Sequence, residues 1–196
     1  MRNATLVLLL GAASCCVMPG LAKADLLGVS PSFPTVTFIS ANTNAITYDP
    51  LAQAPQFQIN AEPVGFEFSP TASGIVINGG SQGVVIEIGV DNNGNLVSGT
   101  AGFSLEGQMA GVINGVTVDY PDGTVLLEGD VYNFGFAAAA PEAAFDFRVN
   151  VTGGALAAYF SCSDLAIYVL SEYSTFTNSF TTAFNGSAKG QLVLLC

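Results

Sequence analysis

Apolar and polar residues alternate along much of this chain, and residues 145–152 show the pattern most clearly. Successive side chains of a β-strand point to opposite faces of the sheet. The alternation therefore predicts a strand that buries Phe145 and Phe147 in a core. Asp146 and Arg148 would face solvent on the other side, where they could form an exposed ion pair worth about 0–1 kcal/mol.

Other runs of apolar and β-branched residues are separated by Gly, Asn, Asp and Pro, which favour turns. Segments 91–95 and 121–123 contain residues that tolerate positive φ, as hairpin turns require. A short helical turn is predicted near 154–160, where Ala and Leu cluster. Together these features predict an all-β fold, a single-domain antiparallel β-sandwich or barrel-like sheet. The further strand-like runs are 35–39, 45–48, 57–60, 74–78, 84–90, 96–105, 115–119, 124–136, 165–172 and 190–194.

The first 24 residues have the features of a signal peptide. Arg2 precedes an apolar run at 4–13, and Ala22-Lys23-Ala24 is a small-x-small cleavage site. The apolar run is about half of the roughly 20 residues that a spanning helix needs. We therefore expect cleavage after Ala24, one mature domain at residues 25–196, and a secreted protein, extracellular or periplasmic, with no membrane insertion.

The chain has four cysteines, and cleavage would remove Cys15 and Cys16. Both follow small residues, so lipidation at one of them is an alternative to the cleaved signal peptide. The remaining pair, Cys162 and Cys196, predicts one intramolecular disulfide in an oxidising compartment. A free thiol and a bond between chains are the alternatives. In the loop-entropy model a closure of this length contributes about 3–4 kcal/mol.

The composition is strongly acidic, with a formal net charge of −11. Loss of Arg2 and Lys23 with the signal peptide would leave 15 acidic residues against the cations Arg148 and Lys189, a formal charge of −13. Nucleic acids and anionic lipids are bound through cations that displace counterions from phosphates. This charge balance excludes nucleic acid and membrane surfaces as partners, and it suits solubility and divalent-cation binding.

The chain contains no histidine, which removes Ser-His-Asp and Cys-His nucleophiles, His-ligated zinc and the commonest general base. We therefore expect a non-enzymatic protein with no catalytic residue and no cofactor. The chemistry left open is that of paired carboxylates on a sugar substrate. Glu128 and Asp130, which share one strand face, are the candidates for a carboxylate-dependent glycoside hydrolase or lyase.

Calcium is the metal for which the sequence contains a partial binding motif. Asp91, Asn93 and Asn95 have the alternate-residue spacing at which Ca²⁺ loops begin. An EF-hand loop continues with Gly at its sixth position and Glu at its twelfth, and here these are Leu96 and Gly102. A hairpin turn explains the same oxygen-bearing residues without a metal.

Several short segments resemble a group of secreted bacterial β-rich proteins, many of which carry a PEP-CTERM-type sorting tail; these segments are 126–131, 134–136, 145–149, 151–154, 171–172, 174–176 and 184–190, and more weakly 25–28. The resemblance implies export from a Gram-negative cell and an envelope or extracellular-matrix setting. It assigns no reaction and no catalytic residue. This chain departs from the group because it lacks the Pro-Glu-Pro motif, the apolar helix and the basic tail of that sorting signal.

The leading hypothesis is a secreted structural or interaction protein of the envelope or matrix, which acts through its surface by strand-edge pairing or divalent binding. Its partner would be an extracellular polysaccharide or a matrix protein, and the sequence leaves its oligomeric state open. A carbohydrate-binding module is the alternative, because exposed aromatic side chains could form a flat platform. The tyrosines that it would use are Tyr120, Tyr132, Tyr159, Tyr168 and Tyr173.

Overall fold

The computed structural model describes residues 26–28, 32–54, 56–79, 83–139 and 141–195 of the 196-residue chain. The predicted signal peptide, with Cys15 and Cys16, lies outside these residues. The described chain is all-β, and its one helical element is a short 3-10 helix, η1 (Ala157–Tyr159), inside the segment where a helical turn was predicted. Its strands are β1 (Thr35–Ser40), β2 (Ile46–Tyr48), β3 (Phe57–Glu67), β4 (Ile75–Asn78), β5 (Val84–Val90), β6 (Leu96–Ile113), β7 (Val116–Ala139), β8 (Glu142–Gly153), β9 (Asp164–Ser171), β10 (Phe184–Gly186) and β11 (Ala188–Leu194).

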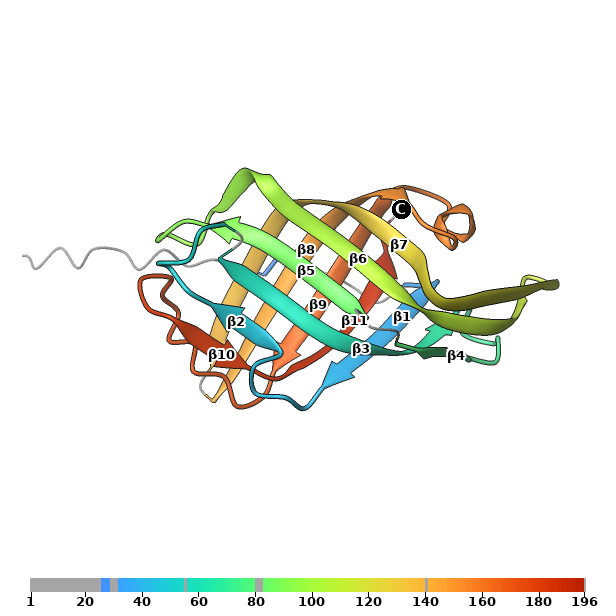
Figure 1. The fold of residues 1–196 in the computed structure, drawn as a ribbon, viewed down its shortest axis with the longest axis horizontal. Helices are drawn as coiled ribbons and strands as arrows, with labels where there is room; N and C mark the ends of the chain where they lie inside the picture. Colours follow the sequence, from blue (N-terminus) through green and yellow to red (C-terminus); the bar gives the residue numbers. More distant parts are fainter. Residues whose placement is uncertain (1–25, 29–31, 55, 80–82, 140, 196) are drawn as a thin grey trace, which may run out of the picture.

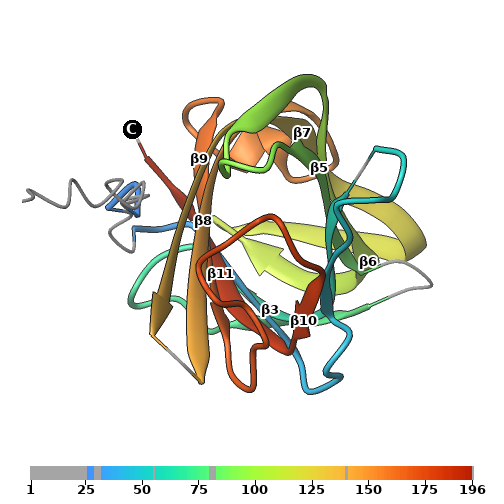
Figure 2. The same ribbon diagram turned by 90° about the vertical axis from the view of Figure 1, so that its left-hand side faces the viewer.

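These strands form one antiparallel sheet that closes on itself (Figures 1 and 2). Neighbouring strands follow the order β1, β11, β9, β8, β7, β6, and β6 then pairs with both β4 and β5. The ring closes because β4 and β5 pair with β3, and β3 pairs with β1. The all-β antiparallel prediction is confirmed, and a barrel-like closed sheet is observed rather than two stacked sheets.

The interior is built by period-two burial, as the hydrophobic pattern predicts. In β3, Phe57 and Ile59 are fully buried, while Asn60 between the inward positions is exposed. The neighbouring β5 places Ile86 opposite Ile59, and Ile86 is fully buried as well. Side chains from strands all around the ring therefore meet in one apolar core.

An aromatic cluster fills one end of the closed sheet. The loop between β9 and β10 sends Phe176 and Phe180 inward, where both are almost fully buried. The ring centroids of Phe136 and Phe180 are 4.8 Å apart, and the hydroxyl of Tyr48 donates a 2.8 Å hydrogen bond to the carbonyl oxygen of Phe180. Figure 2 looks along the long axis at this end, where the loop before β10 crosses the ring. The loop thus closes the end of the sheet with side chains from outside the strands.

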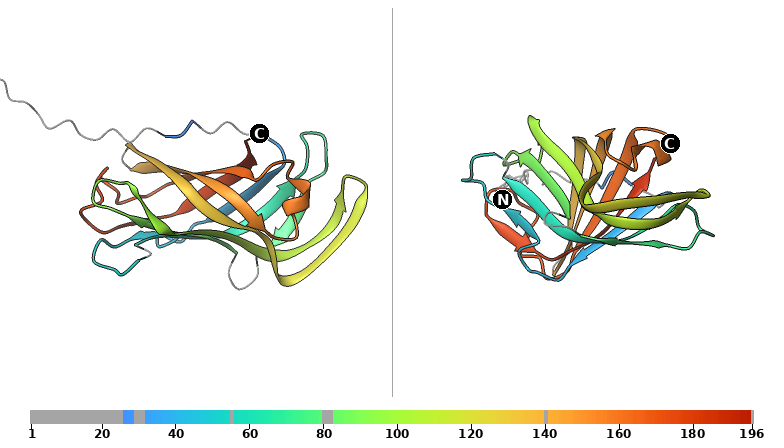
Figure 3. Two further views of the ribbon diagram at one scale, coloured as in Figure 1. Left: turned by 90° about the horizontal axis from the view of Figure 1, so that it is seen from above. Right: turned by 45° about the vertical axis from the view of Figure 1, so that its right-hand side comes forward.

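A long hairpin extends from the other end of the molecule (Figure 3). It consists of the end of β6 and the start of β7, joined by Asn114 and Gly115, whose φ angles are +48° and +80°. These positive φ angles are those that a tight hairpin turn requires. The structure corrects the predicted turn at 121–123: these residues lie within β7, at an irregularity where the β6–β7 register shifts, and the turn is at Asn114 and Gly115.

The structure corrects two predictions for β8, the exposure of Asp146 and the ion-pair partner of Arg148. Asp146 lies on the outward-facing side of the strand, but it is only 1% exposed, because residues 26–28 of the N-terminal segment lie against it. Arg148 pairs with Asp164 on β9 and not with Asp146. Periodicity gives the direction of a side chain, and it carries no information on what a distant segment will cover.

Candidate functional site

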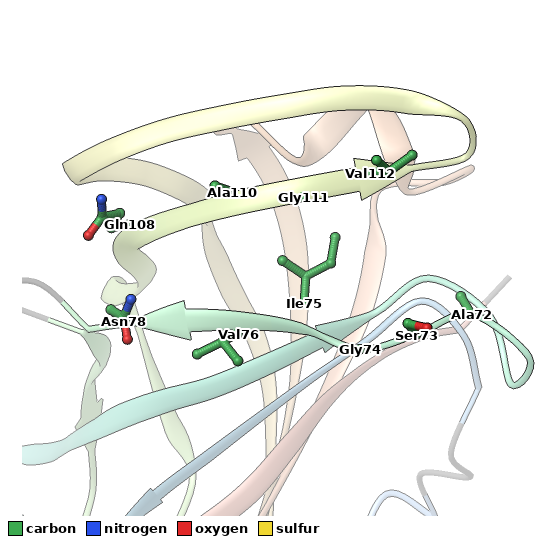
Figure 4. A pocket seen from close by; sticks show the side chains of 10 residues that line it. All are labelled: Ala72, Ser73, Gly74, Ile75, Val76, Asn78, Gln108, Ala110, Gly111 and Val112. Carbon is green, nitrogen blue, oxygen red and sulfur yellow. The ribbon is translucent and has the colours of Figure 1, made fainter.

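A cleft opens where β4 and β6 separate (Figure 4). The two strands pair at Ile77 with Met109 and at Asn78 with Gln108, and no pairing between them is assigned beyond this point in the described chain. From there β4 follows β3, while β6 continues in the projecting hairpin with β7. We call the resulting space, about 660 Å³ in volume, the edge cleft; Ile75, Val76, Asn78, Gln108, Ala110 and Val112 are among the residues that line it.

The edge cleft presents both main-chain groups and apolar side chains. Val76 and Val112, from its two sides, are 66% and 60% exposed. Ile113 and Val116 flank the hairpin turn, so they form the first hydrogen-bonded pair of the β6–β7 ladder. Because consecutive residues of a strand direct their N–H and C=O groups to alternate sides, those of Val112 point away from β7. They lie on a sheet edge that lines the cleft.

The charges around the edge cleft are negative. Glu67 on β3 lies beside Gly74, with its Cγ 3.5 Å from the position of a Cβ at that glycine. Asp119 and Asp122 lie exposed on the β7 side of the hairpin. The cations of the described residues are elsewhere, since Arg148 is on β8 and Lys189 on β11. A cationic partner would therefore meet attraction and no like charge at this end of the molecule.

A second depression, here called the outer groove, lies on the outside of β1, β3, β9 and β11 and has a volume of about 540 Å³. It is lined by the apolar side chains of Ile39, Val64 and Leu170 and by the polar side chains of Tyr168, Lys189 and Gln191, among others. The strand register explains this grouping, because Lys189 pairs with both Ile39 and Leu170, and Gln191 pairs with Tyr168. The residue pattern of the chain does not predict this site, since its residues come from strands far apart in the sequence.

The predicted calcium residues form a turn between β5 and β6, in agreement with the alternative given above. Oδ1 of Asp91 accepts hydrogen bonds from the amides of Asn93 (2.9 Å) and Asn95 (2.8 Å), and Oδ2 accepts one from the Asn95 side chain (3.0 Å). The hydrogen bond from the Asn95 side chain is the main cause that lowers the pKa of Asp91, and desolvation opposes it. Both carboxylate oxygens are thus engaged in holding the turn, and calcium binding here stays a prediction.

The candidate catalytic carboxylates Glu128 and Asp130 lie on β7 and are both exposed. They occupy the same outward face, as predicted, with Gly129 buried between them. Neither lines the edge cleft or the outer groove. Both carboxylates therefore lie on the exposed face of β7, outside the two depressions that could enclose a sugar.

An ion-pair cluster on the outer face joins β7, β8 and β9. The guanidinium of Arg148 pairs with the carboxylate of Asp164, and Nε of Arg148 lies 3.3 Å from Oδ1. The hydroxyl of Tyr132 donates a 2.7 Å hydrogen bond to the same oxygen. Desolvation alone would raise the pKa of Asp164, but the bonds from Arg148 and Tyr132 and the charge of Arg148 together lower it. The guanidinium of Arg148 is thus already engaged in an ion pair.

The tyrosines proposed for a carbohydrate platform are spread over the molecule. Tyr120 on β7 interacts with Tyr159 in η1, and its hydroxyl donates to the carbonyl oxygen of Ala155 at 3.3 Å. Tyr132 belongs to the ion-pair cluster, Tyr168 to the outer groove, and Tyr173, which is 74% exposed, to the loop after β9. This dispersal disfavours a flat aromatic platform.

Cys162 follows η1 and is partly buried. Cys196, its predicted disulfide partner, lies outside the described residues. The amide of Leu195 donates a 3.2 Å hydrogen bond to the carbonyl oxygen of Asp164. This bond brings the residue before Cys196 close to Cys162 in the fold. The pairing of Cys162 with Cys196 itself stays a prediction.

Neither a family model, nor a curated protein, nor a solved structure matches this chain. In the part of the chain that the structure describes, no helix is long and apolar enough to cross a membrane. Within the same residues, no group of three or more His, Cys, Asp or Glu side chains is arranged to hold a metal ion.

Proposed function

We propose that this chain is a non-enzymatic interaction protein of the bacterial envelope or extracellular matrix, and that it binds an extended segment of a partner polypeptide in the edge cleft. The observation that carries the proposal is the separation of β4 from β6 beyond Ile77 and Met109. It exposes the edge of one strand of a closed sheet. A strand edge can bind an extended peptide through main-chain hydrogen bonds, a mode known as β-augmentation.

The proposed location in the envelope or matrix rests on the N-terminal sequence and on the resemblance described above. The apolar run at 4–13 and the Ala22-Lys23-Ala24 triplet support export, and the resemblance to secreted β-rich proteins supports an envelope or matrix location. The absence of histidine from the sequence supports a binding role over hydrolase chemistry.

The chemistry of the cleft defines the partner segment. Val76 and Val112 favour apolar residues at alternate positions, because every second side chain of an added strand faces the same side. The carboxylates of Glu67, Asp119 and Asp122 favour a cation at each end of the segment. A second copy of this chain is a poorer partner, since its net charge is also negative.

Fluorescence anisotropy with a labelled probe peptide tests this proposal. The probe is a short peptide of alternating valine and threonine with a lysine at each end, titrated with the mature chain. We expect saturable binding that is lost when the peptide is N-methylated on alternate residues, because N-methylation removes the main-chain donors that pair with an edge.

Two matched variants locate the binding. Val112→Lys should weaken the probe about tenfold, a loss typical of an interface residue worth more than about 1 kcal/mol. Val116→Lys is the control, since Val116 is similarly exposed at 55% and is not among the cleft residues. Equal binding of the N-methylated peptide, or equal effects of the two variants, would contradict the proposal.

A further inference from the structure

The outer groove combines an apolar wall with a cation in a strongly acidic protein. Ile39 is 46% exposed and Val64 48% exposed, and both line the groove beside the aliphatic side chain of Leu170. Small-molecule sites are typically concave and lined mainly by apolar side chains, with a few polar groups among them. A volume of about 540 Å³ lies within the range of about 300–1,000 Å³ typical of small-molecule sites.

Lys189 gives the groove its polarity. It is exposed at the groove wall, between Ile39 and Leu170 in the strand register. No carboxylate of the described chain forms an ion pair with it, whereas Arg148, the other cation of these residues, is paired with Asp164. An ammonium group without a salt-bridge partner beside apolar side chains would attract an anionic group on a ligand.

The other polar side chains of the outer groove lie next to one another across three strands. Tyr168 and Gln191 face each other across β9 and β11, and Thr37 pairs with Gln191 from β1. Hydroxyl and amide groups in this row can donate hydrogen bonds to an oxygen acceptor. The groove thus presents a polar row next to an aliphatic row that carries the ammonium of Lys189.

We propose that the outer groove binds a single-chain anionic amphiphile, a long-chain fatty acid carboxylate. Its hydrocarbon chain lies along Ile39, Val64 and Leu170, and its carboxylate binds the ammonium of Lys189. This site shares no residue with the edge cleft and does not depend on the proposed peptide binding.

Isothermal titration calorimetry of the mature chain with dodecanoate, below its micelle concentration, tests the inference. We expect saturable binding of dodecanoate, with dodecanol and butanoate both weaker, because each lacks one half of the recognised chemistry. Lys189→Gln should weaken dodecanoate about fivefold, as expected for an ion pair at a partly exposed site. Lys189→Arg should retain the affinity, since it keeps the charge.

The apolar wall has its own variant pair. Val64→Gln should weaken the binding of both dodecanoate and dodecanol, whereas Val116→Gln, at an exposed valine that lines neither site, should leave both unchanged. Circular dichroism confirms that each variant is folded before its affinity is interpreted.

Three results would overturn the inference. The first is equal affinity for dodecanoate and dodecanol together with no effect of Lys189→Gln. This result would show that the carboxylate of the ligand is not recognised. The second is unchanged binding by Val64→Gln, which places the ligand elsewhere. The third is co-sedimentation with phosphatidylglycerol vesicles that free dodecanoate does not compete with, which makes the groove a membrane-docking surface.

Discussion

The amide of Leu27 donates a 2.5 Å hydrogen bond to Oδ2 of Asp146, a residue 119 positions further along the chain. This bond holds the N-terminal segment against the outer face of β8 and encloses a carboxylate. The other oxygen of Asp146, Oδ1, is buried without a hydrogen-bond partner among the described residues. Burial raises the pKa of Asp146, and the amides of Leu27 and Gly28 oppose this rise.

Asp146 should make stability fall as pH rises. A carboxyl whose pKa is raised in the folded state binds more protons when folded than when unfolded, so its contribution is fully present below the unfolded value of about 3.9 and is lost as pH rises through the folded value. Asp146→Asn removes this dependence. In urea unfolding at several pH values, we expect the variant to gain stability relative to the wild type from pH 4 towards neutrality. Identical pH profiles would show that the carboxyl is not desolvated.

Asp164, in contrast, should make stability rise as pH rises. Its pKa is lowered in the folded protein, so its contribution is present above the unfolded value and is lost as pH falls through the folded one. The pair with Arg148 is partly exposed, so Asp164→Asn should cost at most about 1 kcal/mol near neutral pH, and less at high salt. Asp130→Asn on β7 is the matched control, with no ion pair among the described residues. An effect that salt does not reduce would argue for a packing role.

Phe180 should be essential for the aromatic end of the sheet. It is 1% exposed, and its ring lies against those of Phe136 and Tyr48. Phe180→Ala should lower the free energy of unfolding by about 3–5 kcal/mol, the usual cost of such a cavity. Thr181→Ala, at the exposed neighbouring position, should change it little. Chemical denaturation of both variants measures the free energy of unfolding. A loss for Phe180→Ala no larger than that for Thr181→Ala would mean that the loop does not fill the core.

Asp91 should stabilise a turn in the absence of metal. Its carboxylate accepts hydrogen bonds from Asn93 and Asn95, and each such bond contributes about 0.5–1.5 kcal/mol. Asp91→Ala should therefore lower the Tm of the apoprotein. Millimolar calcium should leave the wild-type Tm unchanged, and a rise in Tm that Asp91→Ala abolishes would instead support the calcium prediction.

The predicted disulfide should be detectable directly. Peptide mapping of the purified protein without reduction should yield a cross-linked pair containing Cys162 and Cys196. Cys162→Ser should then lower stability by about 3–4 kcal/mol in the loop-entropy model. A free thiol at Cys162, or a linked dimer, would favour one of the alternatives.

The sequence by itself predicts most strands and the identity of the core. Period-two alternation is a local property, so it places Phe145 and Phe147 inside, and the turn-favouring residues of 91–95 identify a turn in the same local way. It mislocates the other hairpin, because 121–123 contains turn-favouring residues, yet the pairing of Tyr120 and Thr124 with β6 on either side keeps this segment within β7. The turn at Asn114 and Gly115 follows from that same pairing.

Only the tertiary structure decides which distant surfaces meet. The closed sheet depends on the pairing of β1 with both β3 and β11, which no local pattern encodes. The burial of Asp146 depends on a segment at the opposite end of the chain, and the partner of Arg148 on the register of β8 with β9. The edge cleft and the outer groove arise in the same way, because side-chain periodicity is set by the local backbone, whereas clefts are set by where strands pair and where they separate.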